Sequence, residues 1–122
     1  LLIRMYPSRE IVSSPDREQL KEVLQEISVK SSENLSVADM AKFCGWSSSH
    51  FMRWFKKMTG DSFTSYVNDR RLAEAAEALC QTDDKILTIA QDAGFMNLSN
   101  FNRQFKKRYG VTPREYREMI GI

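Results

Sequence analysis

A ten-residue helical pattern occurs twice in this chain, fifty residues apart, and it constrains the fold more than any other feature. Each copy reads Phe-x-Arg-x-Phe-Lys-Lys-x-x-Gly, starting at Phe51 in the first copy and at Phe101 in the second. Upstream of both, the pattern Ala-x-x-x-Gly-aromatic recurs at 41–46 and 90–95, an offset of forty-nine, so the second copy has one extra residue in its turn. Two short helical units repeated in a small chain predict two equivalent surfaces with the same task.

Helix start and stop signals recur along the chain, and they predict an all-α fold. Serine, threonine or asparagine precedes most apolar periodic segments as a candidate N-cap, and glycine follows several of them. No segment alternates apolar and polar residues for long enough to be a strand. The expected helices cover residues 14–30, 36–44, 47–59, 62–80, 85–93, 97–109 and 112–119.

Particular residues are expected to cap these helices. Ser47 and Asn97 precede the two repeated helices, and Thr112 opens a capping box with Glu115. For the helix over 85–93, the turn at 82–84 is expected to supply the cap. A helix, a tight glycine turn and a second helix make a helix-turn-helix, and this order occurs once in each copy.

Length and composition fit one globular domain, with 122 residues of which 42% are apolar. The net charge of +2 says little about partners, but its distribution says more. Residues 47–60 carry three basic side chains and 94–110 carry four, both without an acid, whereas 61–93 carry seven acids and three bases. Positive charge concentrated at the repeated units indicates a surface for nucleic acid.

Each repeated helix divides into two faces when its residues are placed at intervals of 100°. Phe51, Trp54, Phe55 and Met58 fall on one side of the first helix, and Phe101 and Phe105 on one side of the second, so these side chains are expected in the core. The opposite faces carry Ser49, Met52, Arg53 and Lys56 in the first copy, and Ser99, Asn102, Arg103 and Lys106 in the second.

The outward residues suit an α-helix that lies in a major groove. Arginine can bond guanine through two hydrogen bonds, asparagine can do the same to adenine, and serine serves either base. Met52 or Leu98 could contact a thymine methyl group. Lysines one turn further on and the helix N-termini suit phosphate oxygens. The expected phosphate contacts are Ser47, Lys56, Lys57, Asn97, Lys106, Lys107 and Thr112.

Other functional classes need residues that the chain does not offer. Cys44 and Cys80 are expected to be free buried thiols, too few for a disulfide framework, and His50 is the only histidine, so no metal or cofactor is expected. One alternative function is that of a helical protein-interaction module whose basic faces bind an acidic partner. Another is that of an alkyl-transferring repair enzyme, but neither cysteine has a basic neighbour to activate it, so no enzymatic activity is expected. No apolar run reaches the ~20 residues of a membrane span, and a cytoplasmic location is expected.

The second copy reads Gly94-Phe95-x-x-x-Ser99-x-Phe101-x-Arg103-x-Phe105-Lys106-Lys107-x-x-Gly110-x-Thr112-Pro113-x-Glu115-Tyr116-Arg117. These residues resemble the DNA-binding domain of the AraC/XylS family of bacterial transcription regulators. The first copy and Arg71-x-x-x-Ala75 agree with this resemblance, which covers about residues 16–118. Met52 and Leu98 are apolar where the family often has a polar reader.

The resemblance implies seven helices in two helix-turn-helix subdomains, about 16–60 and 82–120, joined by a long linker helix over 62–80. It implies two recognition helices that enter successive major-groove segments of an operator or promoter. Residues 1–15 would be a linker or the tail of a sensor domain that binds an effector, and RNA polymerase is a candidate partner. The family's base-reading positions correspond to Ser49, Met52, Arg53, Leu98, Ser99, Asn102 and Arg103.

Overall fold

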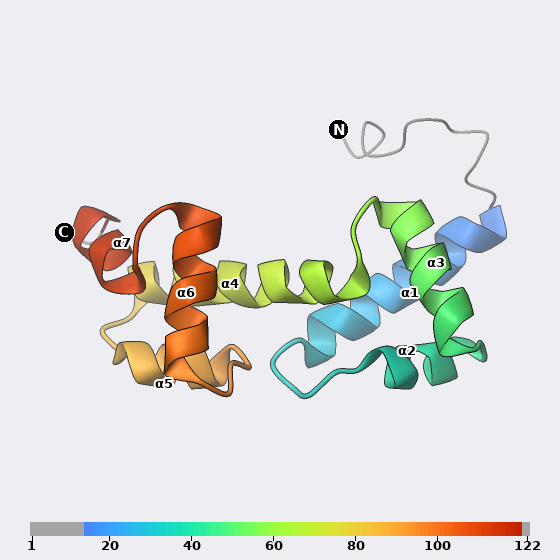
Figure 1. The fold of residues 1–122 in the computed structure, drawn as a ribbon, viewed down its shortest axis with the longest axis horizontal. Coiled ribbons are helices and arrows are strands. Elements are labelled where there is room, and N and C mark those ends of the chain that lie inside the picture. The colour runs from blue at the N-terminus through green and yellow to red at the C-terminus, as the bar shows by residue number, and fades with distance from the viewer. Residues whose placement is uncertain (1–13, 121–122) are drawn as a thin grey trace. The chain divides into compact units, whose positions relative to one another are not determined.

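The computed structural model describes residues 14–120, and within them it contains seven α-helices and no strand (Figure 1). The all-α fold is therefore confirmed, while expectations for residues 1–13 lie outside the described residues. No helix in this range is long and apolar enough to cross a bilayer. The helices are α1 (Ser14–Lys30), α2 (Val37–Cys44), α3 (Ser48–Thr59), α4 (Phe63–Gln81), α5 (Ile86–Asp92), α6 (Leu98–Tyr109) and α7 (Pro113–Ile120).

The described residues form two compact units, and the boundary between them lies inside α4. Unit 1 contains residues 14–30 and 35–67, and unit 2 contains residues 31–34 and 68–120. Each unit holds one of the expected helix-turn-helix pairs, α2 with α3 in unit 1 and α5 with α6 in unit 2 (Figure 1). α4 contributes its first turn to unit 1 and its longer remainder to unit 2.

The repeat in sequence is also a repeat in packing. Phe51 and Phe55 of α3 are fully buried in unit 1, and Phe101 and Phe105 of α6 are fully buried in unit 2. The ring of Tyr66 meets Phe55 edge-on, with the ring centres 5.4 Å apart, and Tyr116 meets Phe105 in the same way at 5.3 Å. The inward faces expected from helical spacing are therefore confirmed for the four phenylalanines and for Met58, whereas Trp54 is only partly buried.

Most of the expected helix caps are present. The side chain of Ser47 accepts a hydrogen bond from the His50 N–H at 3.1 Å, and that of Asn97 accepts one from the Asn100 N–H at 2.8 Å. At α7 the Thr112 hydroxyl accepts from the Glu115 N–H, and the Glu115 carboxylate accepts from the Thr112 N–H. This second bond lowers the pKa of Glu115, because it favours the charged carboxylate.

The expected cap at 82–84 is wrong. The residue that precedes α5 in the N-cap position is Lys85, whose side chain makes no capping hydrogen bond. The Thr82 hydroxyl instead accepts from the Asp84 N–H at 3.2 Å and donates to the Ala78 carbonyl at 2.9 Å. Thr82 therefore closes the end of α4 rather than opening α5.

Residues 31–34 follow α1 along the chain but pack within unit 2, against α4. The Arg71 guanidinium donates to the Ser31 carbonyl through Nε and to the Glu33 carbonyl through Nη2, the latter at 2.6 Å. The Ser31 hydroxyl donates to the Glu74 carboxylate at 2.9 Å, and Ser31 is only 2% exposed. The carbonyl of the buried Ser31 needs such a partner, and with the second bond to Glu33 Arg71 holds this segment in place.

Gly94, in the turn between α5 and α6, makes room for that segment. Its φ is +104°, and a Cβ atom placed on it would lie 3.0 Å from both the Cα and the carbonyl oxygen of Ser32. Gly45, the equivalent residue of the first copy, also has a positive φ, of +78°, but a Cβ there would meet nothing within 4 Å. The two glycines thus share a positive φ and differ in their surroundings.

Candidate nucleic-acid interface

The outward face of α3 is exposed along its whole length. Ser49 and Arg53 are exposed, and so are Lys56 and Lys57 in the last turn. Met52 is 47% exposed, a high fraction for a large apolar side chain. Ser47 is the N-cap of this helix, so the first N–H groups and the positive end of the helix dipole lie at the same end as Ser49.

The outward face of α6 has the same layout with different residues. Ser99, Asn102 and Arg103 are exposed, and Leu98 at the first helical position is 38% exposed. Lys106 and Lys107 are exposed one turn beyond Arg103. Each base-reading candidate named from the sequence is therefore accessible.

Thr112 differs from the other expected phosphate contacts. It is half-buried, and its hydroxyl and its backbone N–H both take part in the capping box of α7. Ser47 and Asn97 are exposed, although their side-chain oxygens cap α3 and α6.

The basic side chains on the outward faces of α3 and α6 form no salt bridge with the acidic residues among 14–120. Within residues 14–120 the salt bridges join Lys30 to Glu26, Arg70 to Glu74 and Arg108 to Asp69, and none includes a predicted contact residue. Arg108 belongs to the basic cluster of the second copy in sequence, yet its Nε lies 3.7 Å from the Asp69 carboxylate. The lysine pairs and the two repeated arginines thus remain available for an anionic partner.

Asn100 is a residue of this face that the sequence analysis did not single out. Its side-chain oxygen accepts a hydrogen bond from Nη2 of Arg103 at 2.8 Å, which orients the guanidinium. The equivalent residue of the first copy is His50, whose ring lies 4.4 Å from that of Trp46. The contact between Asn100 and Arg103 could have been expected from the sequence, because residues three apart on a helix are neighbours.

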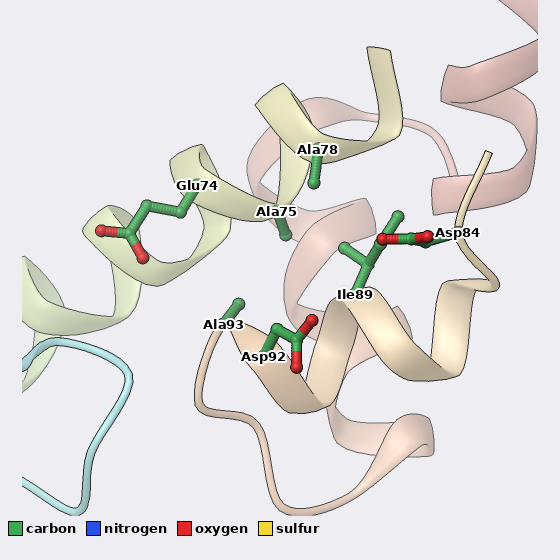
Figure 2. Close-up of a pocket in the computed structure, with 7 residues that line it drawn as sticks. All are labelled: Glu74, Ala75, Ala78, Asp84, Ile89, Asp92 and Ala93. Carbon is green, nitrogen blue, oxygen red and sulfur yellow. The ribbon is translucent and has the colours of Figure 1, made fainter. Parts of the chain in front are cut away.

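A small pocket in unit 2 has the opposite charge. It has a volume of about 110 Å³ and lies between α4 and α5, as Figure 2 shows. It shares no residue with the outward face of α6, and its carboxylates would repel phosphate. Its lining residues are Glu74, Ala75, Ala78, Asp84, Ile89, Asp92 and Ala93.

The expectation that both cysteines are buried is wrong. Cys80 is exposed on α4, one position beyond Leu79 at the edge of the buried stripe, and Cys44 is half-buried. Burial raises the pKa of the Cys44 thiol, and the Gln19 amide donates to its sulfur at 3.5 Å.

A thiol reagent is therefore expected to modify Cys80 before Cys44, because exposure and thiolate fraction control the rate. Mass spectrometry after partial labelling at neutral pH would identify the modified residue. In a Cys80→Ser variant the fast phase should disappear. Faster labelling of Cys44 would contradict the burial described here.

The comparisons with known proteins agree with the repeated helix-turn-helix geometry. A family model described as a helix-turn-helix domain matches residues 40–119. The chain is 36% identical over 107 residues to the regulatory protein PocR of Salmonella typhimurium, covering 88% of this chain and 35% of PocR. This chain belongs to the AraC-type helix-turn-helix family, and it is a DNA-binding domain of that family.

Two solved structures extend this likeness to the fold. A transcriptional regulator of Chromobacterium violaceum with an AraC-type DNA-binding domain is 28% identical, with a TM-score of 0.78 over 88% of this chain and 96% of that one. The DNA-binding domain of AdpA, solved with a target DNA, is 23% identical with a TM-score of 0.74, covering 88% and 93%. The chain spans about a third of the length of PocR.

Proposed function

We propose that this chain binds double-stranded DNA sequence-specifically for a bacterial transcription regulator, with α3 and α6 as recognition helices in successive major-groove segments. The observation that carries the proposal is the duplicated face. An exposed arginine and an exposed lysine pair stand at the same positions of α3 and α6, on the side opposite two fully buried phenylalanines. A helix with its apolar side fixed in a core can present only its other side to a groove.

The base-reading roles follow from the chemistry of the exposed side chains. Arg53 and Arg103 suit guanine, and Asn102 suits adenine. Ser49 and Ser99 can donate to or accept from either, and Met52 and Leu98 suit a thymine methyl group. Because these sets differ between the two helices, we expect two unlike half-sites.

Phosphate contacts fix where the helices lie. We assign this role to the lysine pairs and to the N-terminal ends of α3, α6 and α7, where helix dipoles favour an anion. AdpA, which has the same fold, has been solved with its target DNA, and this supports DNA as the ligand. The residues assigned to phosphate are Ser47, Lys56, Lys57, Asn97, Lys106, Lys107 and Thr112.

The partners of the whole protein form a second part of the proposal. We propose that residues 16–120 are the DNA-binding part and that residues 1–15 lead from a sensor domain that binds an effector. RNA polymerase is the proposed further partner at a promoter, in the cytoplasm. No catalytic role is assigned to any residue of the chain.

Binding is expected to weaken with salt, and Lys106→Ala should reduce that dependence. Each neutralised phosphate releases counterions, so the slope of log K against log salt should become shallower by about one unit for each lost contact. Fluorescence anisotropy at several salt concentrations measures the slope. Lys106→Ala should weaken all DNA sequences about equally.

A matched control for this variant is Lys21→Ala, which removes the same charge from an exposed position of α1. Its slope should equal that of the parent. Equal slopes for all three proteins would contradict the phosphate role of Lys106. A gel shift with random DNA fragments at low salt separates the proposal from a module for acidic proteins, since that module would give no retardation.

A further inference from the structure

The extra residue in the turn of the second copy is Met96. In the first copy the glycine is followed by Trp46 and then by the N-cap Ser47. In the second copy Phe95 takes the place of Trp46, since it is 6% exposed and its ring lies 5.0 Å from that of Phe101. Met96 is then left between Phe95 and the N-cap Asn97, and it is 96% exposed.

Met96 has no visible role in folding. The residue before an N-cap often packs against the fourth residue of the helix, which is Phe101 in α6. Phe95 makes that contact instead, and Met96 projects into solvent. A large apolar side chain this exposed gains nothing from the fold, and contact with an apolar group of a ligand would remove it from water.

The position of Met96 makes DNA the fitting ligand. The N-terminal residues of a recognition helix are the ones that meet base edges. Met96 and Leu98 flank Asn97 at this end of α6, and both are exposed. At the same end of α3, Ser47 corresponds to Asn97 and Ser48 to Leu98, and the residue before Ser47 is the half-buried Trp46. Only the second copy therefore has an exposed apolar side chain on each side of its N-cap.

We infer that Met96, together with Leu98, contacts the methyl group of one or two thymines in the half-site read by α6. This inference rests on the proposed function. The thymine methyl is the apolar feature of the major-groove pattern, and methionine is flexible and polarisable enough to cover it. Met96 is thus a specificity residue of the second half-site that has no counterpart in the first.

Deoxyuridine tests this inference, because it differs from thymidine only by the missing methyl group of the base. The half-site of α6 is first located around the one base pair whose discrimination is lost in Arg103→Ala. Each thymine there is then replaced in turn, and Kd is measured for the chain and for Met96→Ala. One or two replacements should weaken the parent about 3- to 10-fold, and at one of these positions at least Met96→Ala should bind thymine and uracil equally, because Leu98 can contact only the other methyl group.

Met119→Ala is the matched control, since Met119 is also exposed, at 70%, but lies on α7. It should respond to deoxyuridine as the parent does. Both variants should unfold at the parent's temperature, so a loss of binding cannot come from misfolding.

Three outcomes would overturn the inference. Deoxyuridine could have no effect anywhere in the half-site, Met96→Ala could keep the full methyl effect, or Met96→Ala could weaken every sequence equally, as a sugar–phosphate contact would. In each case a parent that still prefers its site over random DNA leaves the proposed function standing. A parent without such a preference would instead contradict the proposed function itself.

Discussion

Gly94→Ala is expected to lower the free energy of unfolding by about 2–4 kcal/mol. The positive φ of +104° disfavours any residue with a Cβ atom, and that atom would press on the backbone of Ser32 at 3.0 Å. Backbone atoms held by Arg71 cannot move away as a flexible side chain could. Urea denaturation followed by circular dichroism measures the loss.

Gly45→Ala provides the matched control, because Gly45 is the equivalent residue of the first copy. Its φ of +78° carries the same kind of strain, but a Cβ there meets open space. The expected cost is about 1–2 kcal/mol, from the backbone conformation alone. Equal costs at the two positions would contradict the packing of residues 31–34 against Gly94.

Arg103→Ala is expected to weaken binding to the preferred DNA site by about 1–3 kcal/mol, or about 5- to 150-fold. The loss should be confined to one base pair, and the variant should accept other bases there. Asn100 already orients the Arg103 guanidinium, so little side-chain freedom is lost on binding. Kd values for the preferred site and its single-base variants measure both effects.

Arg108→Ala is the control on the same helix, since Arg108 lies against Asp69 and outside the predicted reading set. Arg108→Ala should change the Kd for all DNA sequences by a similar factor. If Arg103→Ala bound the preferred site as tightly as the parent, the reading role of Arg103 would be wrong.

Features governed by neighbours in the chain could be predicted from the sequence. The caps by Ser47 and Asn97, the capping box of Thr112 and the buried phenylalanines depend on residues within about one turn of each other. Because the pattern occurs twice, the same helical spacing predicts the buried and the exposed face of both α3 and α6, and the burial of the phenylalanines agrees in both helices.

Features that depend on distant residues could not be predicted in this way. The hydrogen bonds of Arg71 to residues 31–34 join positions about forty residues apart. Neither the helical spacing around Arg71 nor the residues of 31–34 predict this contact. Cys80 was expected to be buried because its neighbours are apolar, yet it lies just outside the stripe that faces the core of unit 2. Helical spacing predicts which side of α4 faces the core, but it does not predict how many residues beside that stripe are also buried.

The repeat keeps the scaffold and changes the reading residues. The tyrosine–phenylalanine pairs and the caps are nearly the same in both units. On the exposed faces Met52 becomes Asn102, His50 becomes Asn100, and the extra Met96 has no equivalent. A duplicated docking surface with different side chains suits a DNA site whose two halves differ in sequence.

Selection of binding sites from a pool of random double-stranded DNA tests sequence-specific recognition by α3 and α6 most directly. The selected pool should contain two unlike half-sites about one helical turn apart. Repeating the selection with Arg53→Ala should relax the preference at one base pair of one half-site, and with Arg103→Ala at one base pair of the other. A pool without an enriched sequence, or one whose enriched sequence neither substitution alters, would contradict base reading by these two helices.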